Sequence, residues 1–131
     1  MASAADRLAR KLEARIERAA KALVLEIARE LKRTTPVDTG HARANWIPSI
    51  GSPNTAEDSS GALAQAGAAL VAAYKLSSGK LYVTNVVPYI RRLNEGSSTQ
   101  APALFVETAV KRAVDKVRAS TGVDFSSVLV D

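Results

Sequence analysis

The sequence contains no cysteine, a single histidine, and only three Tyr, two Phe and one Trp among its 131 residues. The lack of cysteine excludes a disulfide scaffold and thiolate metal sites, and His41 alone cannot form the usual transition-metal cluster. No apolar run approaches the roughly 20 residues that cross a bilayer, and the N-terminus is charged rather than signal-like. We therefore expect a soluble protein with no metal, no other cofactor and no membrane partner.

The apolar residues that are present make up 47% of the chain, but alanine supplies much of this fraction. A chain of 131 residues is long enough for one domain with a modest core. We expect that domain to span residues 1–120, with residues 121–131 as an extended or partner-ordered tail. A core so poor in large side chains is expected to need partners to finish burying its surface.

The first 34 residues predict one long amphipathic helix. Ser3 is the expected N-cap with Asp6 three residues on, and Pro36 predicts that the helix stops at Thr34. About 28 residues at ~1.5 Å each give a rod of roughly 40 Å, longer than the rest of the domain. We therefore expect part of its apolar stripe to meet another subunit. The stripe consists of Leu8, Leu12, Ile16, Ala19, Leu23, Ile27 and Leu31.

The basic excess of the chain belongs to this helix. Residues 1–33 carry nine Lys/Arg against five Asp/Glu, and the net charge of the whole chain is +5. The charges are expected on the opposite face, either as a solvated surface or as a surface for a polyanion. No aromatic residue interleaves with the cations as single-strand binding requires, so the pattern leaves open only an electrostatic attraction to DNA that does not read its sequence. The residues of this face are Arg7, Lys11, Arg15, Arg18, Lys21, Arg29 and Lys32, among Glu13, Glu17, Glu26 and Glu30.

The triplet Asp38-Thr39-Gly40 invites comparison with retroviral-type aspartic proteases, in which each subunit of a dimer donates one such carboxylate. That fold is nearly all β and needs an apolar strand before the Asp, whereas a long helix and Thr-Thr-Pro come first here. No serine stands in a nucleophile-elbow context that could use His41 as a base. We therefore predict no catalytic residue.

The same segment is better explained as a turn. Asp38 is expected to close an Asx-type turn, and Gly40 supplies a free φ. Residues 42–47 are predicted to leave this turn as a strand with Trp46 on its buried face. His41 is predicted to be an exposed turn residue.

The middle of the chain alternates between loop, helix and strand signals. Residues 48–61 are rich in Pro, Gly, Ser and Asn and predict a flexible loop. Residues 62–74 are alanine-rich and predict a short helix, weakened by Gly67, that packs closely against something. Residues 80–86 alternate apolar and polar side chains as a strand does.

The stretch from Asn85 to Phe105 is the most specified part of the backbone. Pro88 predicts a turn, one helical turn follows, and Gly96 allows a positive φ before a polar loop. Pro102 is placed where a last helix should begin, because its missing N–H costs nothing in a first turn. That helix is predicted over residues 104–119 with Phe105 on its buried side, and Gly122 ends it.

This order predicts an α+β domain in which a long N-terminal helix and a C-terminal helix pack on a small antiparallel β-sheet, with an extra short helix. The edges of such a small sheet invite pairing between subunits.

Two segments together resemble the tail-completion, or neck, proteins of tailed bacteriophages with long tails, a family also described as minor tail components or head-to-tail joining proteins. The resemblance covers about residues 5–118 and leaves the C-terminal tail unmatched. Ala103-Leu104 departs from it, because relatives often have a glycine there. The first segment holds Thr35, Pro36, Val37, Asp38, Thr39, Gly40, Arg43, Asn45 and Trp46. The second holds Asn85, Pro88, Tyr89, Leu93, Asn94, Gly96, Ser98, Gln100, Ala101, Pro102, Phe105 and Val106.

The resemblance implies a structural virion protein without catalysis, assembled in the host cytoplasm. Similar proteins form a homo-oligomeric ring, commonly of six copies, at the head–tail junction. They contact the tail terminator on one side and the head connector, stopper or adaptor on the other, and the DNA passes through the lumen without sequence-specific binding. A basic DNA-binding accessory module without catalysis is the alternative.

Three groups of residues receive structural or interface roles from this resemblance, and whether they maintain the fold or touch a partner stays open. The first group shapes the turn before the first strand: Pro36, Asp38, Thr39 and Gly40, with Trp46 in the core. The second shapes the later turn: Asn85, Pro88, Tyr89, Leu93, Asn94 and Gly96. The third docks the last helix: Gln100, Ala101, Pro102 and Phe105.

Overall fold

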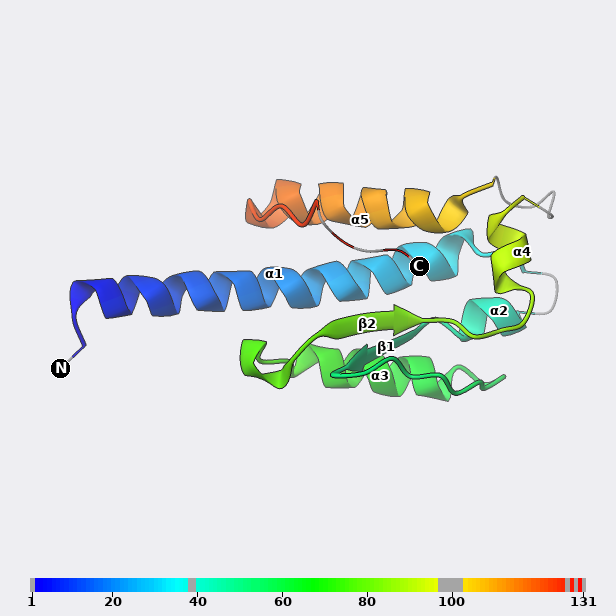
Figure 1. The fold of residues 1–131 in the computed structure, drawn as a ribbon, viewed down its shortest axis with the longest axis horizontal. Coiled ribbons are helices and arrows are strands. Elements are labelled where there is room, and N and C mark those ends of the chain that lie inside the picture. The colour runs from blue at the N-terminus through cyan, green and yellow to red at the C-terminus, as the bar shows by residue number, and fades with distance from the viewer. Residues whose placement is uncertain (1, 38–39, 97–102, 127, 129, 131) are drawn as a thin grey trace.

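The computed structural model describes residues 2–37, 40–96, 103–126, 128 and 130. They form three layers with helix α1 (Ala4–Thr34) in the middle (Figure 1). Helix α5 (Phe105–Thr121) lies along one side of α1, and a two-stranded sheet with α3 (Ala62–Ala72) lies on the other. The predicted α+β class, with long first and last helices and a small antiparallel sheet, is confirmed.

Helix α1 begins and ends as its sequence predicts. The Ser3 hydroxyl accepts a hydrogen bond from the Asp6 backbone N–H, and the Asp6 carboxylate accepts one from the Ser3 N–H, which completes a capping box. At the other end, Thr35 takes an extended conformation because Pro36 follows it. The local signals are therefore sufficient to define a 31-residue helix.

Helix α5 packs most extensively against the second half of α1. The core between them is built from few large side chains, of which Phe105 is almost fully buried. Gly122, with φ of 73°, ends α5 as predicted. The core contains Ala19, Leu23, Ile27, Leu31, Ala42, Trp46, Val87, Ile90, Phe105, Ala109, Ala113, Val114 and Val117.

The region after the first turn differs from the prediction. Residues 41–44 form a short helix, α2 (His41–Ala44), and strand β1 (Ile47–Ile50) begins only after it. The predicted strand over residues 42–47 is therefore wrong, and the loop predicted from residue 48 begins only after β1 ends at Ile50. Proline usually favours a loop, so Pro48 predicted one. It is compatible with β1 because both strands of a two-stranded sheet are edge strands.

Strand β1 pairs antiparallel with β2 (Leu81–Thr84), and Pro48 lies opposite Val83. Helix α3 packs against β1 so closely that a Cβ at Gly67 would lie 2.1 Å from the Pro48 carbonyl oxygen. The close approach expected of this alanine-rich helix is therefore present, and Gly67 makes it possible.

Two short elements and the C-terminal tail complete the chain. A 3₁₀ turn, η1 (Leu76–Ser78), precedes β2, and helix α4 (Ile90–Asn94) follows it. After Gly122, the side chains of Val123, Phe125 and Val128 pack half-buried against the core. Within the described part of the tail, these apolar residues therefore add to the core of their own chain.

Candidate functional site

The turn after α1 is held by a buried hydroxyl. The Thr35 Oγ1 donates to the Leu31 carbonyl at 2.5 Å and accepts the indole N–H of Trp46 at 2.7 Å. Both Thr35 and Trp46 are buried, so each polar atom is satisfied inside the core. Pro36 is buried and Gly40 has φ of 74°, while Asp38 and Thr39 lie outside the described residues. Trp46 is in the core as predicted, although it lies just before β1.

Asn45 ties the long loop before α3 to helix α2. Its buried amide donates to the His41 carbonyl at 2.7 Å and to the Asp58 carbonyl at 2.8 Å, and its Oδ1 accepts the Asp58 N–H at 2.8 Å. A buried amide with three hydrogen bonds specifies one loop conformation. The flexible loop predicted over residues 48–61 is thus anchored at Asp58.

His41 is not the exposed turn residue that was predicted. It begins α2, its side chain is half-buried, and its Nε2 contacts the Glu57 carboxylate. Its Nδ1 lies 3.3 Å from the Ser59 hydroxyl. These are the residue types of a hydrolytic triad, but Glu57 and Ser59 are both exposed on the loop. We interpret the cluster as a second tether between this loop and α2.

Asn85 joins the two sequence segments that carry the family resemblance. Its Nδ2 donates to the Ala42 carbonyl at 2.8 Å, and its Oδ1 accepts the Val87 N–H at 3.0 Å. The residues at positions 42 and 85 are far apart in sequence, so this contact is made by the tertiary structure. Pro88 and Tyr89 follow on the surface, and Tyr89 occupies the N-cap position of α4.

Asn94 connects α4 to the first turn of α5. Its Oδ1 accepts the Val106 N–H at 2.9 Å, its Nδ2 donates to the Glu107 carboxylate at 2.9 Å, and its carbonyl accepts the Leu104 N–H at 2.6 Å. It therefore satisfies N–H groups that a helix start leaves without partners. Leu93, half-buried, packs against the core beside it.

Two backbone positions at this junction are unusual. Gly96 has φ of 100°, and a Cβ there would lie 3.2 Å from the Ala103 Cβ. Leu104 has φ of 60°, a conformation that costs a non-glycine residue free energy. Leu104 belongs to the pair Ala103-Leu104, at which the sequence departs from the family resemblance. Phe105 follows in the core, and Gln100, Ala101 and Pro102 lie outside the described residues.

A charged cluster lies at the α1–α5 interface and includes Glu26 and Glu30, which the sequence predicted on the charged face of α1. Glu30 is buried, and its carboxylate accepts hydrogen bonds from Lys116 at 2.8 Å and Arg33 at 2.7 Å. These hydrogen bonds lower the pKa of Glu30 to about 2, with the one from Lys116 as the largest cause. Lys116 also reaches Glu26 at 2.9 Å, and the two carboxylates raise the pKa of its ammonium.

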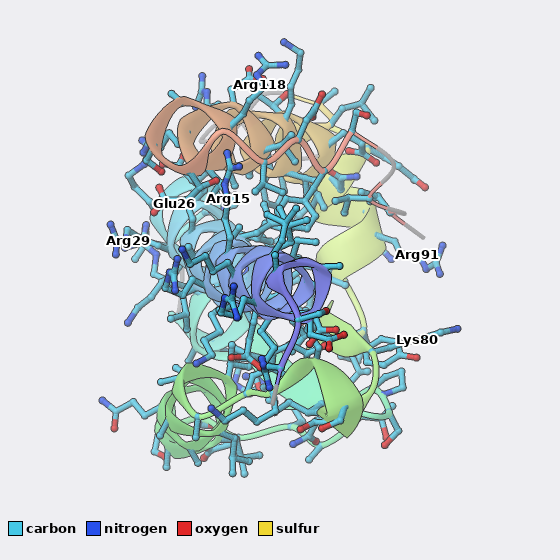
Figure 2. All side chains as sticks on the ribbon, turned by 90° about the vertical axis from the view of Figure 1, so that its left-hand side faces the viewer. Arg15, Glu26, Arg29, Lys80, Arg91 and Arg118 are labelled. Atoms are coloured by element: carbon cyan, nitrogen blue, oxygen red, sulfur yellow. The ribbon has the colours of Figure 1, made fainter. Side chains whose placement is uncertain are left out.

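The first half of α1 extends past the ends of α5 and of the two-stranded sheet (Figure 1). We call residues 4–16 the projecting half and residues 19–34 the buried half. Arg15 marks the boundary on one side, donating to the Thr121 carbonyl at 2.9 Å, and Glu17 marks it on the other, accepting the Leu76 N–H at 2.9 Å. Figure 2, which looks along α1 from this end, shows Arg15 extending toward α5.

The apolar stripe continues along the projecting half and is exposed there. Leu8, Leu12 and Ile16 expose 58%, 47% and 43% of their surfaces, whereas Ala19 and the stripe positions after it are buried. Three large aliphatic side chains in line on one helix face form a contiguous apolar surface. This surface is the feature of the molecule most suited to binding another protein.

Residues 1–67 match the family described as "Bacteriophage HK97-gp10, putative tail-component". The chain belongs to this HK97-gp10-like family. No curated protein and no solved structure matches the chain significantly. The family supports a structural role in a phage tail, and hence a place in the virion.

The HK97-gp10-like match covers α1, α2, β1 and the first half of α3. It includes the first of the two segments noted in the sequence, from Thr35 to Trp46. The second segment, from Asn85 onward, lies beyond it, so its role rests on the contacts that Asn85 and Asn94 make.

Two further observations concern the described residues of this HK97-gp10-like chain. Among them, no group of three or more His, Asp or Glu side chains is arranged to hold a metal ion. None of the described helices is long and apolar enough to span a bilayer.

Proposed function

We propose that this chain forms a homo-oligomeric ring, of six copies by resemblance to its relatives, at the junction between phage tail and head. The ring completes the tail and joins it to the head connector, with the tail terminator on one face and the connector, stopper or adaptor on the other. It acts without catalysis, and the DNA passes through its lumen without sequence-specific contacts. The single observation that carries the proposal is membership of a phage tail-component family.

The exposed stripe of α1 supports an assembled rather than a solitary protein. An exposed apolar patch of large side chains marks an interaction surface in a soluble protein. The tethers made by Asn45, Asn85 and Asn94 support a second aspect of the proposal. They hold the loops in defined positions, as a protein that must fit neighbours on two faces requires.

The experiment is deletion of the gene in the phage that encodes it. We expect electron micrographs of the lysate to show DNA-filled heads and separate tails that lack the ring and are not joined to heads, and a plasmid copy of the gene should restore joined particles. Joined, infectious particles in the deletion lysate would overturn the proposal.

The alternative of a DNA-binding accessory module is tested on the purified protein. A module that bound DNA through α1 would show affinity for duplex DNA that falls steeply with salt, with a slope set by the phosphates neutralised. We expect weak binding, because acidic residues alternate with the cations of α1. Tight, salt-dependent binding together with normal head–tail joining in the deletion would favour the alternative.

A further inference from the structure

A second exposed apolar surface lies on α3. Residues 62–73 contain no charged residue and a single polar side chain, Gln65. Leu70 exposes 63% of its surface, and alanines surround it on the outer side of the helix. We call this surface the alanine face: Ala62, Ala66, Ala69, Leu70 and Ala73.

The alanine face and the stripe of the projecting half complement each other in side-chain size. The stripe presents three large aliphatic side chains, and the alanine face presents small ones around Leu70. Large side chains of one helix pack well where the facing helix carries small ones, because the backbones can approach. The lengths also agree: 13 residues of the projecting half span about 20 Å, and the 11 residues of α3 span about 16 Å.

The charges fit such a contact as well. Within the projecting half, Arg7 and Lys11 form a basic flank of the stripe, and Asp6 and Glu13 lie on the other flank together with Arg10. An uncharged α3 against the stripe leaves both flanks in water at the rim, which is the usual anatomy of a protein interface. Antiparallel pairing of two stripes would instead place the basic flanks of the two copies, each with Arg7 and Lys11, opposite each other.

One copy cannot bring its own two faces together. Helix α1 is continuous, so it carries the stripe away from the body, and α3 lies on the side of α1 opposite α5 (Figure 1). The stripe of one copy can therefore reach the alanine face only of another copy. A contact between two different surfaces of identical chains is heterologous, and it closes into a ring when the rotation allows.

We propose that the projecting half of α1, through Leu8, Leu12 and Ile16, docks on the alanine face of α3 in a second copy of this chain. This inference rests on the proposed ring and names the contact that builds it. It also assigns the same two surfaces to every copy.

The chain has no cysteine, so the contact can be tested by thiol cross-linking without background. Phage particles are grown with Leu12→Cys and Ala69→Cys on one chain and treated with a short bis-maleimide. We expect a ladder of covalent multimers that ends at the copy number of the ring. Leu12→Cys with Arg112→Cys is the matched control, because Arg112 is exposed on α5, and it should remain monomeric.

Two outcomes overturn the contact. Covalent dimers from particles that carry Leu12→Cys alone would show that two stripes pack on each other. Joined particles that contain the protein but give no ladder with the Leu12→Cys, Ala69→Cys chain would show that another surface is used. In both cases the head–tail joining role would stand, whereas joined particles in the deletion lysate would remove that role and not bear on the contact.

Discussion

The two halves of α1 carry the same apolar repeat and have opposite fates. In the buried half, the stripe packs within a core to which α5, the two-stranded sheet and α2 contribute. Its large side chains there are those of Leu23, Ile27 and Leu31, and Leu31 exposes only 2% of its surface. In the projecting half, Leu8 and Leu12 continue the same line with about half of their surfaces in water. The boundary falls where Arg15 reaches the last carbonyl of α5.

This difference teaches that a helical repeat predicts an apolar face but not the chain that covers it. Burial of a leucine contributes about 1.5–3 kcal/mol whether the partner surface belongs to the same chain or to another. The stripe of the projecting half therefore has the composition of a core whose other side is missing in the single chain. Three pairs of substitutions test such contrasts, two along α1 and one on α3, from the largest expected effect to the smallest.

Truncation of a leucine in each half should separate intrachain from interchain burial. Leu31→Ala removes a fully buried side chain and is expected to lower the free energy of unfolding by about 3–4 kcal/mol. Leu12→Ala, on the exposed stripe, is expected to change it by less than about 0.5 kcal/mol. Urea unfolding of both variants, followed by circular dichroism, measures the contrast. Equal losses would show that the two halves are buried alike in the free chain.

A carboxylate in each half should respond differently to neutralisation. Glu30→Gln is expected to cost about 2–3 kcal/mol at pH 7, because the pKa of Glu30 falls from 4.5 to about 2 on folding. A lowered pKa stabilises the fold fully above the unfolded value, and the effect is lost as pH falls from about 4.5 toward 2. The difference between variant and wild type should therefore shrink when urea unfolding is repeated at pH 3.

Glu13→Gln is the matched control in the projecting half. Glu13 is exposed, so its neutralisation should leave stability unchanged to within about 0.5 kcal/mol at pH 7. A Glu30→Gln variant as stable as wild type at pH 7 would mean that the Lys116 and Arg33 contacts merely offset the cost of burying the carboxylate.

The two faces of α3 give the smallest contrast. Gly67→Ala adds a Cβ that would lie 2.1 Å from the Pro48 carbonyl oxygen, so the helix must shift away from β1. Overpacking costs about 1–3 kcal/mol, offset by about 1 kcal/mol of helix propensity, and we expect a net loss of about 1–2 kcal/mol. Ala69→Ser, on the outer face, should be within about 0.5 kcal/mol of wild type by thermal unfolding. A stabilised Gly67→Ala variant would contradict the close packing of α3 on β1.

The two longest helices, α1 and α5, were predicted well because their signals are local. Ser3 and Asp6 cap α1, Pro36 stops it, and Gly122 ends α5, and each of these effects acts within one turn of the chain. The position of β1 was predicted wrongly because Pro48 is typical of a loop. Only its pairing with Val83 shows that Pro48 lies in a sheet. Neither the left-handed conformation of Leu104 nor the burial of Glu30 had a local sequence signal.

The tethers could not be predicted because their partners are distant in sequence. Asn45 and Asn85 occur in the two segments that suggested the family, but nothing local links Asn45 to Asp58 or Asn85 to Ala42. An asparagine amide can serve any carbonyl or N–H within reach. The packing of the helices and the two-stranded sheet therefore determines which group each asparagine binds.

The sequence by itself determined where α1 begins and ends, where α5 ends, which face of α1 is apolar, and that the core is thin, because capping, periodicity and composition are properties of neighbouring residues. The tertiary structure alone decided how much of that face is covered. Helix α5 has 17 residues against the 31 of α1, so it runs out at the level of Arg15 and leaves the rest of the stripe exposed. The length of α1 that α5 covers depends on where the chain places α5 along α1, and no local sequence pattern predicts that position.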